Sequence, residues 1–213
     1  MEIVRLADVG VKAAALRAAA TLRAGGVILY PTDTLYGLGA DALSDEAVAK
    51  VKRIKGRDEG KPIHAILADI ETAENYVVMN DEARMLARVF WPGSLTLIFE
   101  KKEGIDTGIG SAIDTFGARV SDNPFALELA HTFGKPYTGT SANRSGEKSE
   151  RSVGGILTQL EDAASGIDLV IDAGELLDSL PSTVVDVHSA GPVILREGAV
   201  SIAEVWNVLR AER

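Results

Sequence analysis

Short apolar runs alternate with longer amphipathic stretches along most of the chain. The short runs have the length of buried strands, and the longer stretches repeat apolar residues at helical spacing. The pattern predicts helices at residues 11–24, 44–55, 69–77, 81–90, 124–133 and 153–162, and from residue 201 onward. It predicts strands at residues 27–30, 63–67, 94–99, 118–120, 137–141, 168–171, 183–187 and 192–195.

Helices and strands interleave throughout this pattern, which is typical of a sheet covered by helices on both faces. The last two predicted strands follow one another closely, so part of the sheet is expected to be antiparallel. A chain of 213 residues without a repeat, linker or low-complexity segment suits one domain. The sequence therefore predicts a single three-layer α/β domain over residues 1–213, with a mixed parallel and antiparallel sheet.

Composition excludes several classes of protein and site. The chain has no cysteine, which removes disulfides, cysteine-ligated zinc and thiol catalysis. No apolar run approaches the roughly 20 residues that cross a bilayer, and the acidic start does not resemble a signal peptide. We therefore expect a cytoplasmic protein that binds no membrane. The net charge of −9 argues against a large surface that follows a nucleic-acid backbone.

A polar loop follows the apolar run Val27–Tyr30. After Pro31 come three polar residues, Thr32–Thr34, and then Tyr36. Polar groups at the end of a buried strand must be hydrogen-bonded, because each unsatisfied group costs about 1–3 kcal/mol. Ligands of α/β proteins bind at strand ends, so we expect a ligand here; a turn that satisfies its own groups is the alternative.

A basic cluster stands out against the acidic composition. It consists of Lys52, Arg53, Lys55, Arg57 and Lys61. Lys55 and Arg57 flank Gly56, where a predicted helix ends, and we expect both side chains to be exposed. A compact cluster of this kind suits a small anion such as a nucleotide, although it is also compatible with a solvated helix face.

Two motif-like patterns have competing interpretations. Gly37 and Gly39 resemble part of a dinucleotide fingerprint, but such glycines follow the strand directly and open a helix. Here six residues separate Tyr30 from Gly37, and the next helix begins only after Ser44. We therefore expect a tight turn at these glycines.

The segment around Ser141 resembles a nucleophile elbow, except that Asn143 stands where the motif has glycine. A triad would pair Ser141 with His188 and either Asp172 or Asp186. The alternative is that Ser141 and Asn143 are hydrogen-bonding groups at a strand end. No histidine and carboxylate pair has metal-ligand spacing, so we expect no metal held by the protein alone.

Two arginines are attached to predicted buried strands. Arg119 lies in the short strand at 118–120, and Arg196 follows an apolar run. Because such charges are rarely buried unpaired, each is expected to meet an acid such as Asp33 or Asp186, or the anion of a ligand.

Seven segments together resemble the YrdC family of threonylcarbamoyl-AMP synthases, in order and spacing, over about residues 25–200. The matching segments are Pro31–Leu38, Lys55–Arg57, Phe90–Thr96, Ala118–Val120, Ser141–Gly146, Pro181–Asp186 and Ile194–Ala199. The chain is similar to the short form of the family, which lacks the additional C-terminal domain. The resemblance implies a twisted mixed sheet that is concave on one side.

The resemblance also implies an activity. Members of the family form threonylcarbamoyl-AMP and pyrophosphate from L-threonine, bicarbonate or CO₂ and ATP, and Mg²⁺ is expected with the ATP. The product passes to a separate transferase complex that modifies a tRNA adenosine. Because this chain is acidic, we do not expect it to bind tRNA directly and stably.

The family pattern implies roles for individual residues. Lys55 and Arg57 would contact the ATP phosphates and are the predicted catalytic residues. The other predicted nucleotide-binding residues are Lys61, Ser141, Asn143 and Arg196. The residues predicted to contact threonine or its carbamate are Thr34, Tyr36, Arg119 and Ser182.

The sequence departs from the family pattern at two positions. Asp58 replaces a proline that many relatives have after the Lys-x-Arg pattern, and Ile66 stands where many have histidine. His64 lies two places earlier, on the same face of the strand, and we hypothesise that it substitutes; an unchanged threonine KM in a His64→Ala variant would contradict this. A family paralogue with another acceptor and a double-stranded RNA-binding protein are the alternative functions.

Overall fold

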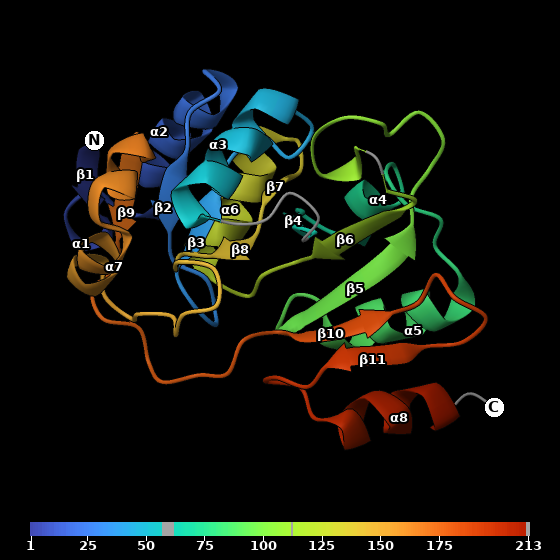
Figure 1. The fold of residues 1–213 in the computed structure, drawn as a ribbon. Coiled ribbons are helices and arrows are strands. Elements are labelled where there is room, and N and C mark those ends of the chain that lie inside the picture. The colour runs from blue at the N-terminus through green and yellow to red at the C-terminus, as the bar shows by residue number, and fades with distance from the viewer. Residues whose placement is uncertain (57–61, 112, 212–213) are drawn as a thin grey trace.

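The computed structural model describes residues 1–56, 62–111 and 113–211 (Figure 1). Its helices are α1 (Leu6–Val9), α2 (Val11–Arg23), α3 (Asp45–Lys55), α4 (Ile70–Ala73), α5 (Asp81–Phe90), α6 (Pro124–Phe133), α7 (Val153–Leu160) and α8 (Ile202–Ala211), with 3₁₀ turns η1 (Gly108–Gly110) and η2 (Glu161–Gly166). None of these helices is long and apolar enough to cross a bilayer.

The strands form two mixed sheets. The first has the order β1-β9-β2-β3-β8 and the second the order β11-β10-β5-β6-β4-β7. Their bounds are β1 (Glu2–Arg5), β2 (Ile28–Tyr30), β3 (Gly37–Gly39), β4 (Ala65–Ile66), β5 (Leu95–Glu100), β6 (Thr115–Arg119), β7 (Tyr137–Thr138), β8 (Thr140–Ser141), β9 (Leu169–Asp172), β10 (Thr183–Asp186) and β11 (Val193–Arg196). The final hairpin, β10 with β11, is antiparallel as predicted.

The two sheets are joined at β7 and β8. The predicted strand at 137–141 breaks at Gly139, so β7 pairs in the six-stranded sheet and β8 in the five-stranded sheet. An antiparallel bridge between Asp41 and Tyr137 continues the pairing across the junction. The buried Thr138 hydroxyl donates to the Leu38 carbonyl at 2.8 Å. The sheets therefore form one twisted frame whose halves Figure 1 shows on the left and right.

Helices cover both faces of the five-stranded sheet. Successive residues of a strand point to opposite faces, and Ile28 and Tyr30 share a buried cluster with α2 and α6, whereas Val27 and Leu29 pack with α3 and α7. The three-layer prediction is confirmed for this half of the molecule.

The six-stranded sheet is covered differently. Leu95, Leu97 and Phe99 of β5 pack in the same cluster as α5 and α8. The alternate residues Thr96 and Ile98 face a cavity instead. This open face is the concave side that the family resemblance implied, and it positions the site described below.

Helix ends follow the local sequence signals. The Ser44 hydroxyl accepts the Ala47 N–H at the start of α3, and Ser201 and Glu204 form a capping box before α8. The helix predicted at 69–77 is shorter, because after Ala73 the chain pairs with the end of β5: the Val78 N–H donates to the Glu100 carbonyl at 2.9 Å.

The dinucleotide fingerprint and the tight turn are both wrong for Gly37 and Gly39, which lie in β3 opposite β2. A Cβ atom on Gly37 would stand 3.0 Å from the ring of Tyr30, and one on Gly39 2.9 Å from Ile28. The glycines are therefore needed because the side chains of β2 lie directly over the β3 backbone.

Candidate functional site

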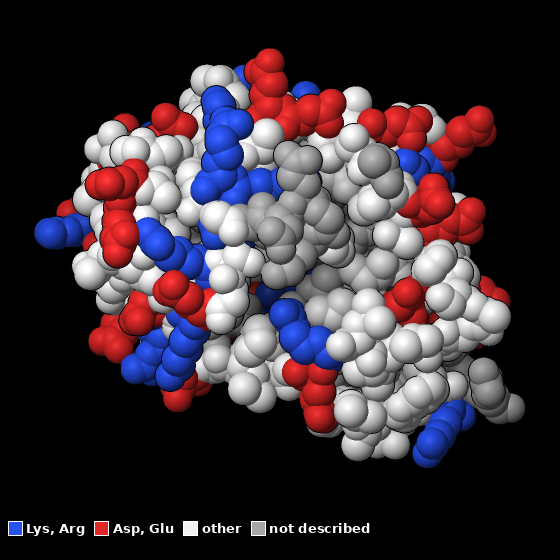
Figure 2. Space-filling view, viewed as in Figure 1, with Lys and Arg blue, Asp and Glu red and all other residues white. Residues whose placement is uncertain are grey.

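A cavity of about 970 Å³ lies between the two sheets. One wall is the loop between β2 and β3 with the start of β8. The other wall is the open face of the six-stranded sheet, together with residues 178–182 that lead into β10. Lysine and arginine side chains gather in a band over the left and centre of this face of the molecule, despite its net negative charge (Figure 2).

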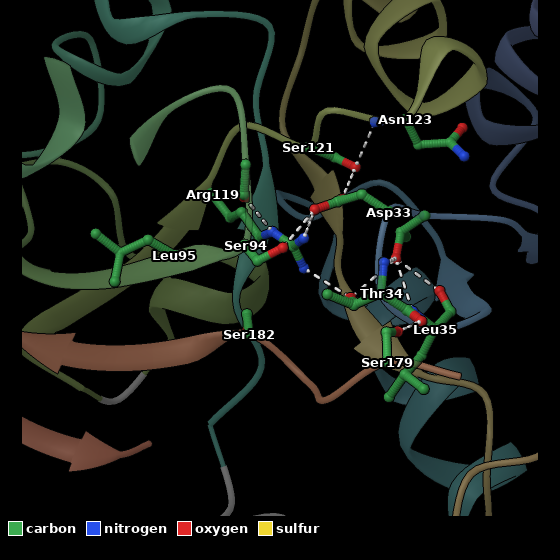
Figure 3. Close-up of polar contacts among 12 residues, drawn as sticks. Asp33, Thr34, Leu35, Ser94, Leu95, Arg119, Ser121, Asn123, Ser179 and Ser182 are labelled. Carbon is green, nitrogen blue, oxygen red and sulfur yellow. Dashed lines mark hydrogen bonds and ion pairs between the residues drawn. The ribbon is translucent and has the colours of Figure 1, made fainter. Parts of the chain in front are cut away.

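A buried ion pair lies behind the cavity wall. The Arg119 side chain at the end of β6 is 4% exposed, and its Nη2 atom is in close contact with Oδ2 of Asp33. Ser94 donates to the same oxygen at 2.8 Å, and Ser121 donates to Oδ1 at 2.5 Å. Arg119 Nε donates to the carbonyl of Gly93 at 2.8 Å. Figure 3 shows these groups converging from three separate segments.

The environment of Asp33 keeps its carboxylate charged. Burial on its own would raise the pKa of Asp33, but the positive charge of Arg119 and the hydrogen bonds from the two serines outweigh it. The pKa of Asp33 is therefore held below its usual range. The expectation that Arg119 meets Asp33 is confirmed.

The loop that precedes β3 is held by its own hydroxyl groups. Thr32 Oγ1 accepts the N–H groups of Thr34 and Leu35, each at 3.1 Å, and donates to the Leu35 carbonyl at 2.6 Å. The Thr34 hydroxyl lies 3.1 Å from Thr32 Oγ1 and accepts from Arg119 Nη1 at 3.1 Å. Thr34 and Arg119 both line the cavity. The Thr32 hydroxyl thus holds the shape of the loop.

The segment after β9 is anchored to this loop. Tyr36 also lines the cavity, and its hydroxyl accepts the Ala173 N–H at 2.9 Å and donates to the Gly174 carbonyl at 2.8 Å. The Ser179 hydroxyl donates to the Thr34 carbonyl at 2.5 Å (Figure 3). Residues 173–182 thus cross from one half of the molecule to the other while held against the polar loop.

Ser182 and Arg196 meet at the same wall. The Ser182 hydroxyl is 2.8 Å from that of Thr96, and Arg196 donates to the Ser182 carbonyl at 2.7 and 3.1 Å. Partial burial and the charge of Arg119 lower the pKa of Arg196 from its usual value. Both guanidinium groups face one cavity, so an anion placed there would be attracted by both.

The sequence led us to expect an exposed Lys55, and this prediction is wrong. Lys55 is buried, with 2% of its surface exposed. Its ammonium donates to the carbonyl and Oδ1 of Asn143, both at 2.9 Å, and closely contacts the carbonyl of Ser141. Arg57 and Lys61 lie outside the described residues. Within the basic cluster, the Lys55 side chain is therefore buried, because Ser141 and Asn143 at the end of β8 and in the following loop supply oxygen acceptors for its ammonium.

Ser141 lines the cavity, and its hydroxyl donates to Asn143 Oδ1 at 2.6 Å. His188 pairs with Asp186, Nδ1 to Oδ1 at 2.9 Å. The predicted alternative triad is not formed, since the Ser141 hydroxyl is directed to an amide and not to His188.

His64 and Ile66 both line the cavity, next to Gly139. They face the same side, as predicted, although His64 precedes strand β4 and only Ile66 lies in it. The substitution of His64 for the family histidine stays a hypothesis.

Sequence reasoning missed three residues that hold the site: Ser94, Ser121 and Ser179. Ser94 lies within the matching segment Phe90–Thr96, and Ser121 directly follows the segment Ala118–Val120, so their positions were a usable signal. Nothing in the sequence around Ser179 distinguishes it from a surface loop residue.

A family model described as "Sua5_yciO_yrdC: Telomere recombination" matches residues 20–198. A curated relative named threonylcarbamoyl-AMP synthase, from Pyrococcus abyssi, is 36% identical over 193 residues, covering 90% of this chain and 56% of the relative. A relative of the same name from Mus musculus is 40% identical over 192 residues, covering 86% of this chain and 67% of the relative. The chain thus spans little more than half of the archaeal relative.

Among solved structures, P. abyssi Sua5 complexed with L-threonine superposes with a TM-score of 0.86 at 33% sequence identity. The superposition covers 98% of this chain and 60% of that one. The match extends over both sheets, so the frame around the cavity is shared.

Proposed function

Since the chain belongs to the Sua5/YciO/YrdC family, we propose that it is an L-threonylcarbamoyladenylate synthase, a nucleotidyltransferase. Its substrates would be L-threonine, bicarbonate or CO₂, and ATP, and its products threonylcarbamoyl-AMP and pyrophosphate. The observation that carries the proposal is the convergence of Thr34, Arg119 and Ser182 on one cavity, in a frame similar to that of a relative solved with L-threonine.

The amino-acid side of the cavity suits a small polar zwitterion. Arg119 supplies a buried cation for a carboxylate, and its guanidinium is fixed by Asp33 and Gly93. The Thr34 hydroxyl is bonded to this guanidinium, Ser182 lines the same cavity, and both hydroxyl groups can exchange hydrogen bonds with the carbamate. A fixed guanidinium loses little freedom when it binds, which is why preorganised arginines suit carboxylates.

The reaction needs no covalent enzyme intermediate. The neutral amine of threonine attacks the carbon of CO₂ and loses a proton, which gives a carbamate. A carbamate oxygen then attacks the α-phosphorus of ATP, and pyrophosphate leaves with the bond electrons. The contribution of the protein is positioning and charge stabilisation, as in phosphoryl transfer generally.

The nucleotide would occupy the Ser141 and Arg196 side of the cavity, with Asn143 behind Ser141. Arg57 and Lys61 stay predictions for the phosphates. Mg²⁺ would be carried by phosphate oxygens and water, because the described residues include no group of three carboxylates or histidines that could hold it. The product is a reactive mixed anhydride, so we propose that a separate cytoplasmic transferase complex passes its acyl group to tRNA.

Pyrophosphate release from ATP and bicarbonate, with and without L-threonine, tests the proposal. Release that requires threonine is expected. Release that is independent of threonine, or no release, would contradict the proposed activity.

A further inference from the structure

Lys55 is a buried lysine whose ammonium contacts three oxygen atoms of one loop. Its side chain leaves the last residue of α3, and the following Gly56 ends the helix with φ +56°. These three oxygens are the Ser141 carbonyl, the Asn143 carbonyl and Asn143 Oδ1. Three acceptors match the three N–H donors of an ammonium group.

The backbone of Lys55 holds the same loop. Its carbonyl accepts the Ser145 N–H at 2.9 Å. Lys55 therefore holds the loop at two places. Its side chain bonds residues 141 and 143, and its main-chain carbonyl bonds residue 145.

The contacts continue from the loop to the cavity. Asn143 Oδ1 receives both the Lys55 ammonium and the Ser141 hydroxyl. The Asn143 amide nitrogen donates to the Glu147 carbonyl at 2.5 Å, which fixes the orientation of the amide. Ser141 lines the cavity, whereas Lys55 and Asn143 are not among the residues that line it.

We propose that Lys55 is a positioning residue, which holds the Ser141–Ser145 loop in place as the nucleotide-side wall and donates to no phosphate. A buried cation that left these oxygens to reach a phosphate would take the ammonium donor from the Asn143 carbonyl, and would leave the Ser141 carbonyl and Asn143 Oδ1 only their weaker neutral donors, the Asn143 N–H and the Ser141 hydroxyl; losing a charged donor in a buried place is costly. The inference rests on the proposed nucleotide site and deepens it.

The affinities of a Lys55→Met variant for AMP, ADP and ATP, measured by calorimetry, separate the two roles. A positioning role predicts that Kd rises about tenfold for all three ligands alike, since the wall that they share is displaced. A phosphate contact predicts a loss that grows at least tenfold from AMP to ATP, and that result, or an unchanged Kd, would overturn the inference. Lys50→Met is the matched control, because Lys50 lies on the same helix and donates to Gly25.

If the variant does not fold, amine acetylation of the wild-type protein, followed by mass spectrometry, distinguishes the positioning role of Lys55 from a phosphate contact. Lys55 is expected to react at least tenfold more slowly than Lys148, an exposed lysine at the cavity, both with and without ATP. A reactive Lys55 that ATP protects would overturn the inference. A wild-type protein that binds none of the three nucleotides contradicts the proposed function itself, which is a separate outcome.

Discussion

At the scale of single residues, Arg119 serves two partners of different kinds. On one side its guanidinium neutralises Asp33, and on the other its Nη1 atom reaches Thr34 at the cavity. Under the proposed function, stability and threonine binding would therefore be coupled at this residue. A double-mutant cycle separates them.

Arg119→Met leaves the Asp33 carboxylate buried without its cation. We expect the free energy of unfolding to fall by about 3–5 kcal/mol, the usual cost of breaking a buried pair. Adding Asp33→Asn removes the stranded charge and should restore much of the stability. Threonine-dependent pyrophosphate release should stay at least about 100-fold below wild type in the double variant, a loss of about 2.7 kcal/mol.

Urea denaturation measures the stability part of this cycle and a coupled pyrophosphate assay measures the activity. If the double variant regained the activity together with the stability, Arg119 would be a structural residue only.

The lowered pKa of Asp33 predicts a pH dependence of stability. A carboxyl group with a depressed folded-state pKa stabilises the fold above its unfolded value of about 3.9. That contribution is lost as pH falls through the folded-state pKa. The difference in unfolding free energy between wild type and Asp33→Asn should therefore be constant from about pH 5 to 7 and shrink below about pH 4.

Urea denaturation of both proteins across this range checks the prediction, with Asp162→Asn as a control at an exposed carboxylate. A difference that grew on acidification would mean that the Asp33 pKa is raised in the folded protein.

At the scale of elements, local signals sufficed where a helix is closed at both ends by its own sequence. Helix α6 runs from Pro124 to Phe133 as predicted, because Asn123 caps its first turn and Gly134 takes the left-handed conformation that ends it. Strand β3 was missed, because its glycines resemble a turn. Only the packing of Tyr30 and Ile28 explains them.

Gly39→Ala tests this explanation of β3. A methyl group would approach Ile28 to 2.9 Å, and we expect a loss of about 1–3 kcal/mol, as for overpacked cores. Gly154→Ala on α7 meets no atom within 4 Å and should be neutral or stabilise by up to about 1 kcal/mol. Thermal or urea unfolding of the two variants gives the comparison; equal effects would contradict the packing argument.

At the scale of the whole molecule, the site depends on contacts between segments far apart in sequence. Strand β1 pairs with β9, with Glu2 opposite Leu169. No local pattern in the first residues predicts this strand. The same holds for Lys55, whose burial depends on a loop more than eighty residues away. The sequence predicted which residues meet at the cavity through a family pattern, whereas the division into two sheets and the inward turn of Lys55 depend on tertiary packing.

The frame would also allow one cavity to take the two kinds of ligand group that the proposed function requires. The polar loop at 32–36 and the cations Arg119 and Arg196 come from opposite walls. The 173–182 segment is bonded to the polar loop through Tyr36 and Ser179, and to the other wall through Ser182. An amino acid held at one wall and a nucleotide at the other would have their reacting groups brought together between the sheets.

The most direct test of this account is the identity of the product. The protein is incubated with L-threonine, ATP, Mg²⁺ and ¹³C-bicarbonate, and the mixture is separated by chromatography with mass detection. The account predicts one new adenylate that carries the labelled carbon and threonine, formed in equal amount to pyrophosphate and absent without threonine. Pyrophosphate formed without any labelled threonyl adenylate, or a labelled product that does not require threonine, would contradict it.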